Sequence, residues 1–118
     1  MTQPNAHELL EIARLTLLEQ VLPTLSSELR YPALMIANAM AIAARENRLE
    51  TEVCGAEQAS LAALVEGTPL SLQAARRQLA GDIRHGRHDT PQSRRTLVKT
   101  LRQATLARLA ISNPKAMP

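Results

Sequence analysis

The stretch ALMIANAMAIAA, residues 33–44, decides the fold that we expect for this chain. It consists mainly of helix-forming residues and is apolar on every side except at Asn38, and a helix of this kind has to be buried all round. The stretch is too short to cross a bilayer, and Arg30 and Arg45 bracket it closely. We therefore expect it to lie at the centre of a helical bundle.

The composition predicts a single helical domain, residues 1–118, with an aliphatic core. The chain has the ordinary length of one domain, and Tyr31 is its only aromatic residue, so Leu, Ala, Ile, Val and Met must fill the interior. Cys54 has no second cysteine to pair with, and the first residues lack the basic and apolar regions of a secretion signal. These features predict a cytoplasmic protein without a membrane segment.

Helix start and stop signals divide the chain into four or five pieces, and no strand pattern competes with them. Asn5 followed by Glu8 resembles a capping box, and Pro23 removes a backbone donor. Gly55 is expected to break the second helix, and Ser71 to cap the fourth. The predicted fold is an all-α compact bundle of four to five helices around a central Ala-rich helix. The predicted helices span residues 5–22, 32–53, 56–66, 71–85 and 91–111, with a short helical continuation over residues 24–30. Gly86 is the expected stop after the fourth helix, and Thr90 the expected cap of the last. The inward-facing and core positions expected in the last three helices are Leu61, Leu64, Val65, Leu72, Ala75, Leu79, Ile83, Leu97, Val98, Leu101, Ala104 and Leu109.

A polar stripe on the central helix is the first candidate site. Tyr31, Asn38 and Arg45 are spaced seven residues apart, close to two helical turns, and so fall nearly on one line. In one interpretation Asn38 is a buried amide that bonds a neighbouring helix and fixes the packing register. In the other, the three side chains line a cleft for a ligand or a partner, and Arg45 binds a carboxylate or a phosphate.

Charge is distributed unevenly along the chain. Residues 1–70 hold four Arg and nine Glu, a net charge of −5, whereas residues 71–118 hold ten Lys or Arg and two Asp, a net charge of +8. Acidic and basic helices can compensate each other locally, or the basic half can form a surface for an anionic partner. The absence of aromatic residues from this half and of a helix-turn-helix pattern disfavours nucleic-acid binding. The candidate basic surface consists of Arg77, Arg84, Arg95, Lys99 and Arg102.

No sequence motif indicates catalysis. His85 and His88, with Asp82 and Asp89 nearby, are the only cluster of metal-ligand residue types, and a second pair that would complete a four-ligand set is missing. Cys54 has no neighbouring base, and we expect an inert thiol. Phosphate-binding loops, nucleophile elbows and metalloprotease helices are also missing. The sequence therefore names no catalytic residue, metal or cofactor and argues against an enzyme.

A resemblance can be stated on four segments: HELLE at residues 7–11, EQVLP at 19–23, ANAMAI at 37–42 and LARLAISNP at 106–114. With these the chain resembles a family of short, uncharacterised bacterial all-helical proteins. The resemblance implies a domain of unknown function, often encoded beside aminoglycoside-phosphotransferase-like kinases and acyl-CoA dehydrogenases. It carries over no catalytic residue.

Two function hypotheses follow. Leu15 and Leu106 lie off the main apolar lines of their helices, so they could seed a homodimer or dock on a larger protein. We favour a non-catalytic interaction or accessory module whose partner is another protein, such as the kinase-like or dehydrogenase-like neighbour, or a second copy of the chain. The alternative is a small-molecule binding or catalytic subunit that uses Tyr31, Asn38 and Arg45.

Overall fold

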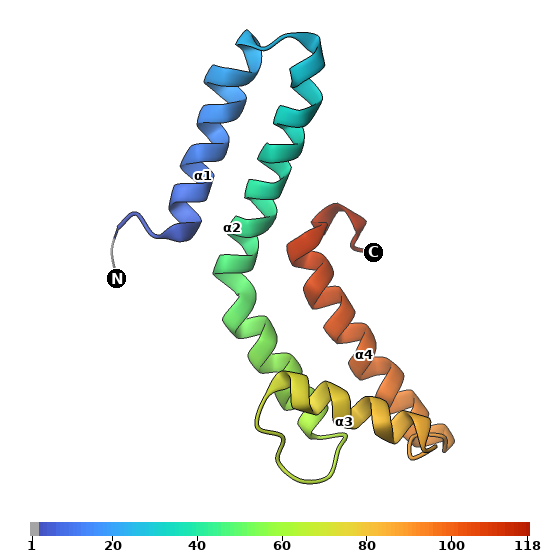
Figure 1. The fold of residues 1–118 in the computed structure, drawn as a ribbon. Helices are drawn as coiled ribbons and strands as arrows, with labels where there is room; N and C mark the ends of the chain where they lie inside the picture. Colours follow the sequence, from blue (N-terminus) through green and yellow to red (C-terminus); the bar gives the residue numbers. More distant parts are fainter. Residues whose placement is uncertain (1–2) are drawn as a thin grey trace. The chain divides into compact units, whose positions relative to one another are not determined.

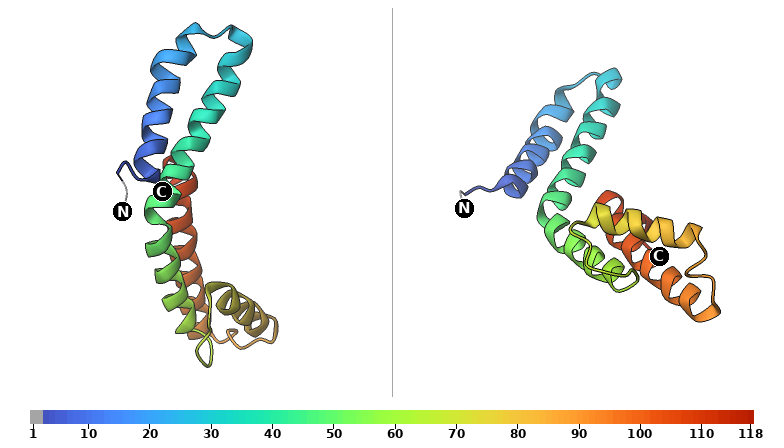
Figure 2. Two further views of the ribbon diagram at one scale, coloured as in Figure 1. Left: turned by 60° about the vertical axis from the view of Figure 1, so that its left-hand side comes forward. Right: turned by 60° about the horizontal axis from the view of Figure 1, so that its bottom comes forward.

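The computed structural model describes residues 3–118, and all its regular elements are helical (Figures 1 and 2). Four α-helices and no strand occur within this range, which confirms the predicted all-α class. In chain order the elements are α1 (Ala6–Thr16), a π-helical turn (Leu17–Val21), a 3-10 turn (Leu22–Thr24), α2 (Ser27–Ala62), α3 (Leu72–Arg84), α4 (Pro91–Ser112) and a second 3-10 turn (Pro114–Ala116).

α1 begins at the predicted capping box. The Glu8 N–H donates to the Asn5 side-chain oxygen at 2.9 Å, and the Asn5 N–H donates to Glu8 Oε2 at 3.3 Å. The helix then widens into the π turn, where the Leu22 N–H donates to the Leu17 carbonyl. Because Pro23 has no N–H, the regular backbone ladder cannot continue beyond it. The short helical continuation expected next is instead the first turn of α2.

α2 is longer than the sequence signals predicted. It begins at Ser27 rather than at Pro32, and it continues through Gly55 to Ala62, so the separate helix expected over residues 56–66 is wrong. Pro32 lies just beyond the first turn, where its missing N–H costs a single intrahelical bond. A mid-helix glycine costs about 0.5–1 kcal/mol, and the contacts that Glu57 and Leu61 make with α3 and α4 offset that cost.

The caps and stops predicted around α3 and α4 are confirmed. The Ser71 hydroxyl accepts the N–H of Ala74 at 3.0 Å, and the Thr90 hydroxyl accepts a first-turn N–H of α4 at 3.3 Å. Gly67 and Gly86 have φ values of 82° and 75°, in the left-handed region that favours glycine. Gly86 ends the turn after α3, as expected, whereas Gly67 follows a helix that has already ended at Ala62.

The chain divides into two compact units, and the second contains the aliphatic core. This second unit comprises Thr51–Ala110 and Lys115–Pro118, that is, the end of α2, all of α3 and most of α4. Three expected core residues of this unit, Ile83, Val98 and Leu101, are instead exposed. The core consists of Leu61, Ala75, Leu79 and Leu97, with Leu64, Val65 and Leu72 packed against it, and all seven were predicted as core residues or inward-facing apolar positions.

The first unit is a helical hairpin with little core of its own. It consists of the residues up to Glu50 together with Ile111–Pro114, and α1 and the first half of α2 lie side by side and antiparallel in each view (Figures 1 and 2). Its buried apolar side chains are small ones, Ala33, Ala37 and Ala44.

The prediction that residues 33–44 are buried all round is wrong. Leu34, Met35 and Ile36 are 48%, 48% and 51% exposed. The reason is geometric, because α1 covers one line of α2, marked by the buried Ala33, Ala37 and Ala44, and residues beside that line are covered only in part or not at all.

Replacing Gly55 tests the continuity of α2. A Cβ at this position meets no atom within 4 Å, and the position is helical. Gly55→Ala is therefore expected to raise the free energy of unfolding by about 0.5–1 kcal/mol, since alanine loses less backbone entropy in a helix. Urea denaturation of both proteins measures the change.

Gly67→Ala provides the matched control for this experiment. It also meets open space, but its φ of 82° is strained for any residue with a Cβ. This variant is expected to lose about 1 kcal/mol. A loss of stability in Gly55→Ala as well would contradict a continuous α2.

Candidate functional site

The predicted polar stripe lies on α2, but its members differ in their surroundings. Tyr31 is 70% exposed, and Asn38 is exposed as well. Arg45 is half-buried, and its Nε donates to the Ile111 carbonyl at 2.7 Å. The premise that Asn38 is a buried amide is wrong, because α1 covers a different side of the helix. The role of the stripe in ligand binding stays a prediction.

A buried ion cluster, which sequence reasoning missed, joins three helices of the second unit. The Glu57 side chain on α2 is 5% exposed. Arg76 on α3 binds it in a fork, with Nε to Oε1 at 3.0 Å and Nη2 to Oε2 at 2.7 Å. Arg108 on α4 donates from Nη2 to the same Oε1. Paired guanidinium groups are what allow a carboxylate to be buried here.

The cluster fixes Glu57 in its charged form. Hydrogen bonds from Arg76 hold the pKa of Glu57 below its ordinary value of 4.5, and the positive charge of Arg108 lowers it further, against the opposing effect of burial. Both carboxylate oxygens are occupied by arginines, and a lowered pKa makes the group a poor general base. The arrangement is suited to holding helices together and not to proton transfer.

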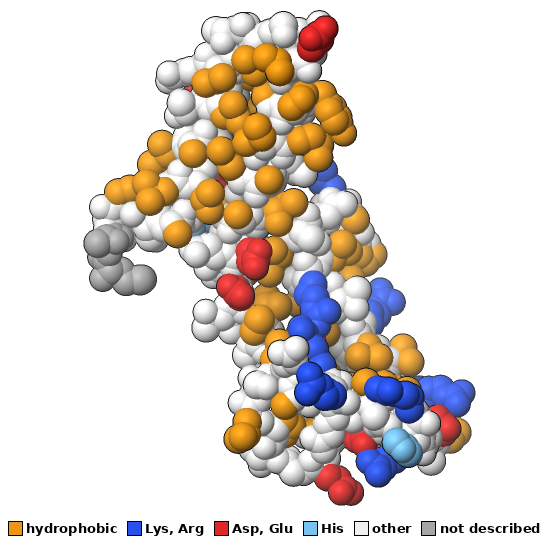
Figure 3. Space-filling model, viewed as in Figure 1, with side chains coloured by type: hydrophobic (Ala, Val, Ile, Leu, Met, Phe, Trp, Pro, Cys, Tyr) orange, Lys and Arg blue, Asp and Glu red, His pale blue; other side chains and the backbone are white. Residues whose placement is uncertain are grey.

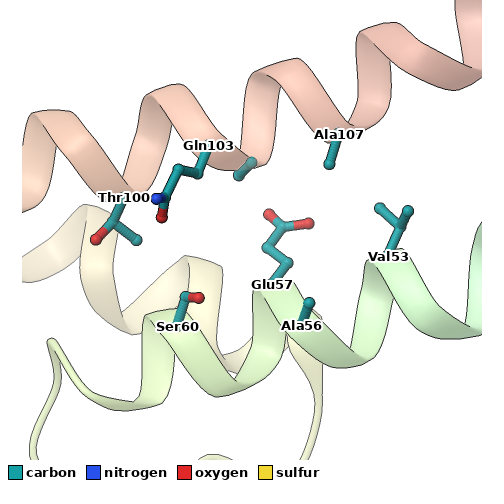
Figure 4. Close-up of a pocket in the computed structure, with 8 residues that line it drawn as sticks. Val53, Ala56, Glu57, Ser60, Thr100, Gln103 and Ala107 are labelled. Atoms are coloured by element: carbon teal, nitrogen blue, oxygen red, sulfur yellow. The ribbon is translucent and has the colours of Figure 1, made fainter.

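A small cleft lies beside Glu57, between α2 and α4 (Figure 4). Glu57 and Val53 point from α2 toward α4, and Gln103 points from α4 toward α2. The cleft measures about 150 Å³, below the range of about 300–1,000 Å³ that is typical of small-molecule sites. It is lined by Val53, Ala56, Glu57, Ser60, Thr100, Gln103, Ala104 and Ala107.

A signal for Glu57 was present in the sequence. The residue lies one turn before Leu61 and one turn after Val53, so it occupies the inward-facing line of its helix. A carboxylate on such a line requires a cationic partner. The sequence could not name the partner, because Arg76 and Arg108 lie 19 and 51 residues away along the chain.

Glu57→Gln tests the cluster as a stabilising element. We expect a loss of about 2–3 kcal/mol at pH 7, because both arginines lose their charged partner. In the wild-type protein this contribution is fully present above pH 4.5, and it is lost as the pH falls through the lowered pKa of folded Glu57. The stability difference between the two proteins should therefore narrow as the pH falls below 4.5, which denaturant titrations measure.

Glu52→Gln is the control, because Glu52 is an exposed carboxylate on the same helix. It should change stability by less than about 0.5 kcal/mol at any pH. Equal effects of the two substitutions would contradict the special role of Glu57.

A basic groove lies on the outer face of α4. It measures about 590 Å³ and contains three of the five residues predicted as the basic surface, Arg95, Lys99 and Arg102. The other two, Arg77 and Arg84 on α3, do not line it. Val98, which is 58% exposed, lies among the cations. The groove is lined by Asp89, Pro91, Arg94, Arg95, Val98, Lys99 and Arg102, and we call this set the basic groove.

The cations of the basic groove repel one another. Within residues 3–118 no ion pair engages Arg94, Lys99 or Arg102. Lys99 follows Arg95 by four residues and precedes Arg102 by three, which places like charges side by side on the helix. This uncompensated charge suits an anionic partner.

Lys99→Gln tests the repulsion. Removing the charge should raise the free energy of unfolding by about 0.2–0.5 kcal/mol at low ionic strength. The gain should vanish near 1 M salt, where charges are screened over about 3 Å. Parallel urea titrations at the two salt concentrations measure this, and a loss of stability at low salt would show that Lys99 is paired in the folded protein.

α1 presents its polar side to α2 and much of its apolar side outward. His7 and Arg14 are half-buried, and the His7 Nδ1–H donates to the Ala44 carbonyl at 3.0 Å. Leu9, Ile12 and Leu15 are exposed. The sequence-based expectation that Leu15 lies off the main apolar line is consistent with this exposure, whereas Leu106 on α4 is half-buried. A helix of this polarity is incompletely covered within its own chain.

One face of the hairpin is apolar across both helices (Figure 3). Hydrophobic side chains gather over α1 and the first half of α2 in this view, and charged side chains lie at the margins. Helical spacing assigns to this side two stripes that flank the line where the helices meet. We call it the apolar hairpin face, and it consists of Leu10, Ala13 and Leu17 from the first stripe and Leu29, Ile36, Met40 and Ala43 from the second.

The histidine cluster does not assemble a metal site. His85 Nδ1–H donates to the Gly81 carbonyl at 2.7 Å, and buried Asp82 is paired with Arg87. His88 lines a separate cleft of about 210 Å³. Within residues 3–118 no group of three or more His, Cys, Asp or Glu side chains is placed to hold a metal ion.

Comparison with known proteins identifies one family model. A model described as Domain of unknown function (DUF6285) matches residues 23–116, a segment that contains α2, α3 and α4. No curated protein and no solved structure matches the chain. None of the helices in the described part of the chain combines the length and apolar character needed to cross a membrane.

Proposed function

The chain belongs to the DUF6285 family of domains of unknown function, and we propose that it acts as a non-catalytic accessory module that binds another protein chain. The binding surface is the apolar hairpin face. The observation that carries the proposal is the incomplete cover of large aliphatic side chains on both helices, with Leu29 and Ile36 of α2 about half exposed and Leu10 and Leu17 of α1 half-buried. Contiguous apolar surface of this kind marks interaction sites on soluble proteins.

The chemistry of the partner follows from the face. The apolar hairpin face has no charged member. The surface of the partner that binds it must therefore also be apolar and largely uncharged, as on one side of an amphipathic helix. The resemblance described above suggests two kinds of protein to test, phosphotransferase-like kinases and acyl-CoA dehydrogenases, which are often encoded beside members of the family that this chain resembles. A helical surface on either enzyme could meet the requirement.

The alternative, a small-molecule or catalytic subunit, has less support. Arg45 already bonds a backbone carbonyl, and Tyr31 and Asn38 are exposed on a helix surface. The basic groove supports a second candidate function, the binding of an acidic protein segment, because its cations are uncompensated. It carries no aromatic platform for single-stranded nucleic acid.

Ile36→Glu and Leu34→Glu form a matched pair that tests the proposed face. The two residues are similarly exposed and lie on the same helix, but on opposite sides of the line covered by α1. Ile36→Glu should abolish co-purification with a partner encoded next to this chain, because it buries an unpaired charge in the contact. Leu34→Glu should retain co-purification. Tagged co-expression with each neighbouring protein measures the outcome.

The reverse pattern, in which only Leu34→Glu loses the partner, would place binding on the opposite side of α2. Unchanged co-purification of both variants would exclude the hairpin as the binding element.

A further inference from the structure

We propose that the occupant of the apolar hairpin face is a second copy of this chain, so that two hairpins pair about a two-fold axis. This inference rests on the proposed function, because it assigns a partner to the same surface. Three observations on the hairpin favour a second copy: the distribution of charge, the size of the face and the alternation of large and small side chains.

The charge distribution fits a symmetric pairing. In a two-fold interface each surface patch meets the same patch of the other copy, so any charge near the axis faces a like charge. The seven residues of the apolar hairpin face include none that is charged. The acidic residues of α1, Glu8, Glu11 and Glu19, lie on other sides of that helix by their spacing. On α2, Glu50 follows Ala43 by seven residues and marks the end of the stripe, so two copies can approach along the face itself without repulsion.

The size of the face fits a specific dimer. The stripe on α2 runs from residue 29 to residue 43, about 21 Å at 1.5 Å per residue, and two helices are about 20 Å wide. This gives a footprint of roughly 400 Å² before side-chain relief is counted. Specific interfaces bury about 600–1,000 Å² of accessible surface per partner. The flat footprint is smaller than that range and side-chain relief adds accessible area to it, so the face fits a small dimer interface.

The side chains of the face alternate in size. Leu10 and Leu17 flank Ala13 on the first stripe, and Ile36 and Met40 precede Ala43 on the second. Large residues of one copy can enter the spaces above the alanines of the other, as in packed helical cores. Pairing two hairpins in this way forms a four-helix bundle. In that arrangement residues 33–44 gain the second neighbour that a single chain does not supply.

Sedimentation equilibrium of the untagged full-length protein tests the proposal. The wild-type chain should have the mass of a dimer at micromolar concentration. Ile36→Glu should weaken dimerisation by about 100-fold or more, since both copies then bury an unpaired carboxylate. Leu34→Glu should remain dimeric. Far-UV circular dichroism should show equal helix content in all three proteins, because residues 34 and 36 are half exposed in the single chain.

The other outcomes contradict the proposal. A monomeric wild-type protein would overturn it, as would a dimer that Leu34→Glu breaks and Ile36→Glu does not. A mass that keeps rising with concentration would indicate head-to-tail association instead of a closed pair. If Ile36→Glu loses helix content, Leu29→Gln, a milder change on the same stripe, replaces it as the test variant. A Leu29→Gln protein that dimerises as strongly as the wild type would also overturn the proposal.

Failure of this inference and failure of the proposed function are distinguishable. If the wild-type protein is monomeric but co-purifies with a neighbouring protein in an Ile36-dependent way, the apolar hairpin face binds a different partner. If the protein neither dimerises nor retains a partner, the interaction role of the face is lost as well.

Discussion

A helix can be covered by one antiparallel neighbour along one line only, and this constraint governs the first half of the chain. α2 meets α1 along Ala33, Ala37 and Ala44, where the small side chains allow a close approach. The sequence on the remaining sides of residues 33–44 is nevertheless that of an interior helix. The conflict between an interior sequence and a surface position is the strongest indication of association in this chain.

In the second unit, helices of the same chain cover one another's apolar sides. Three helices converge on the aliphatic core around Leu61 and Leu79, and Glu57 ties them together through Arg76 and Arg108. Burying a carboxylate costs free energy that an apolar residue would not, so the cluster contributes mainly to specificity. A fork of two bonds from Arg76 is directional, whereas Leu and Ala contacts tolerate sliding. The cluster therefore fixes the register of helices that have few shape-determining side chains.

Local signals predicted the local structure of this chain well. The Asn5 capping box, the Ser71 cap and the start of α4 after Thr90 depend on neighbouring residues alone, and all are present. The errors arose where tertiary packing opposed a local preference. Gly55 disfavours a helix by about 1 kcal/mol, and the contacts of Glu57 and Leu61 with α3 and α4 outweigh this cost. The burial of residues 33–44 was mispredicted. The apolar sequence indicates that this helix is stable when its sides are buried, but it does not indicate whether the same chain or another chain buries them.

The candidate sites were predictable to different degrees for a related reason. The basic groove follows from charges on one helix, so spacing alone brought Arg95, Lys99 and Arg102 together. The Glu57 cluster depends on residues that are distant in sequence. The sequence indicates only that a carboxylate on the inward-facing line of this helix requires a cationic partner.

The uneven charge of the chain has two explanations: local compensation, which the structure shows at one place, and a surface for an anionic partner, which stays a prediction. Acidic and basic segments compensate locally at Glu57, where one carboxylate from the acidic half meets two arginines from the basic half. The basic groove has no comparable compensation among the described residues. It lies on the unit that has its own core, whereas the apolar hairpin face lies on the unit that lacks one. The proposed association through the apolar hairpin face depends on water exclusion and is insensitive to screening, whereas the proposed contacts at the basic groove weaken with salt. The two proposed surfaces lie on different units of the chain, and the salt dependence of binding distinguishes one from the other.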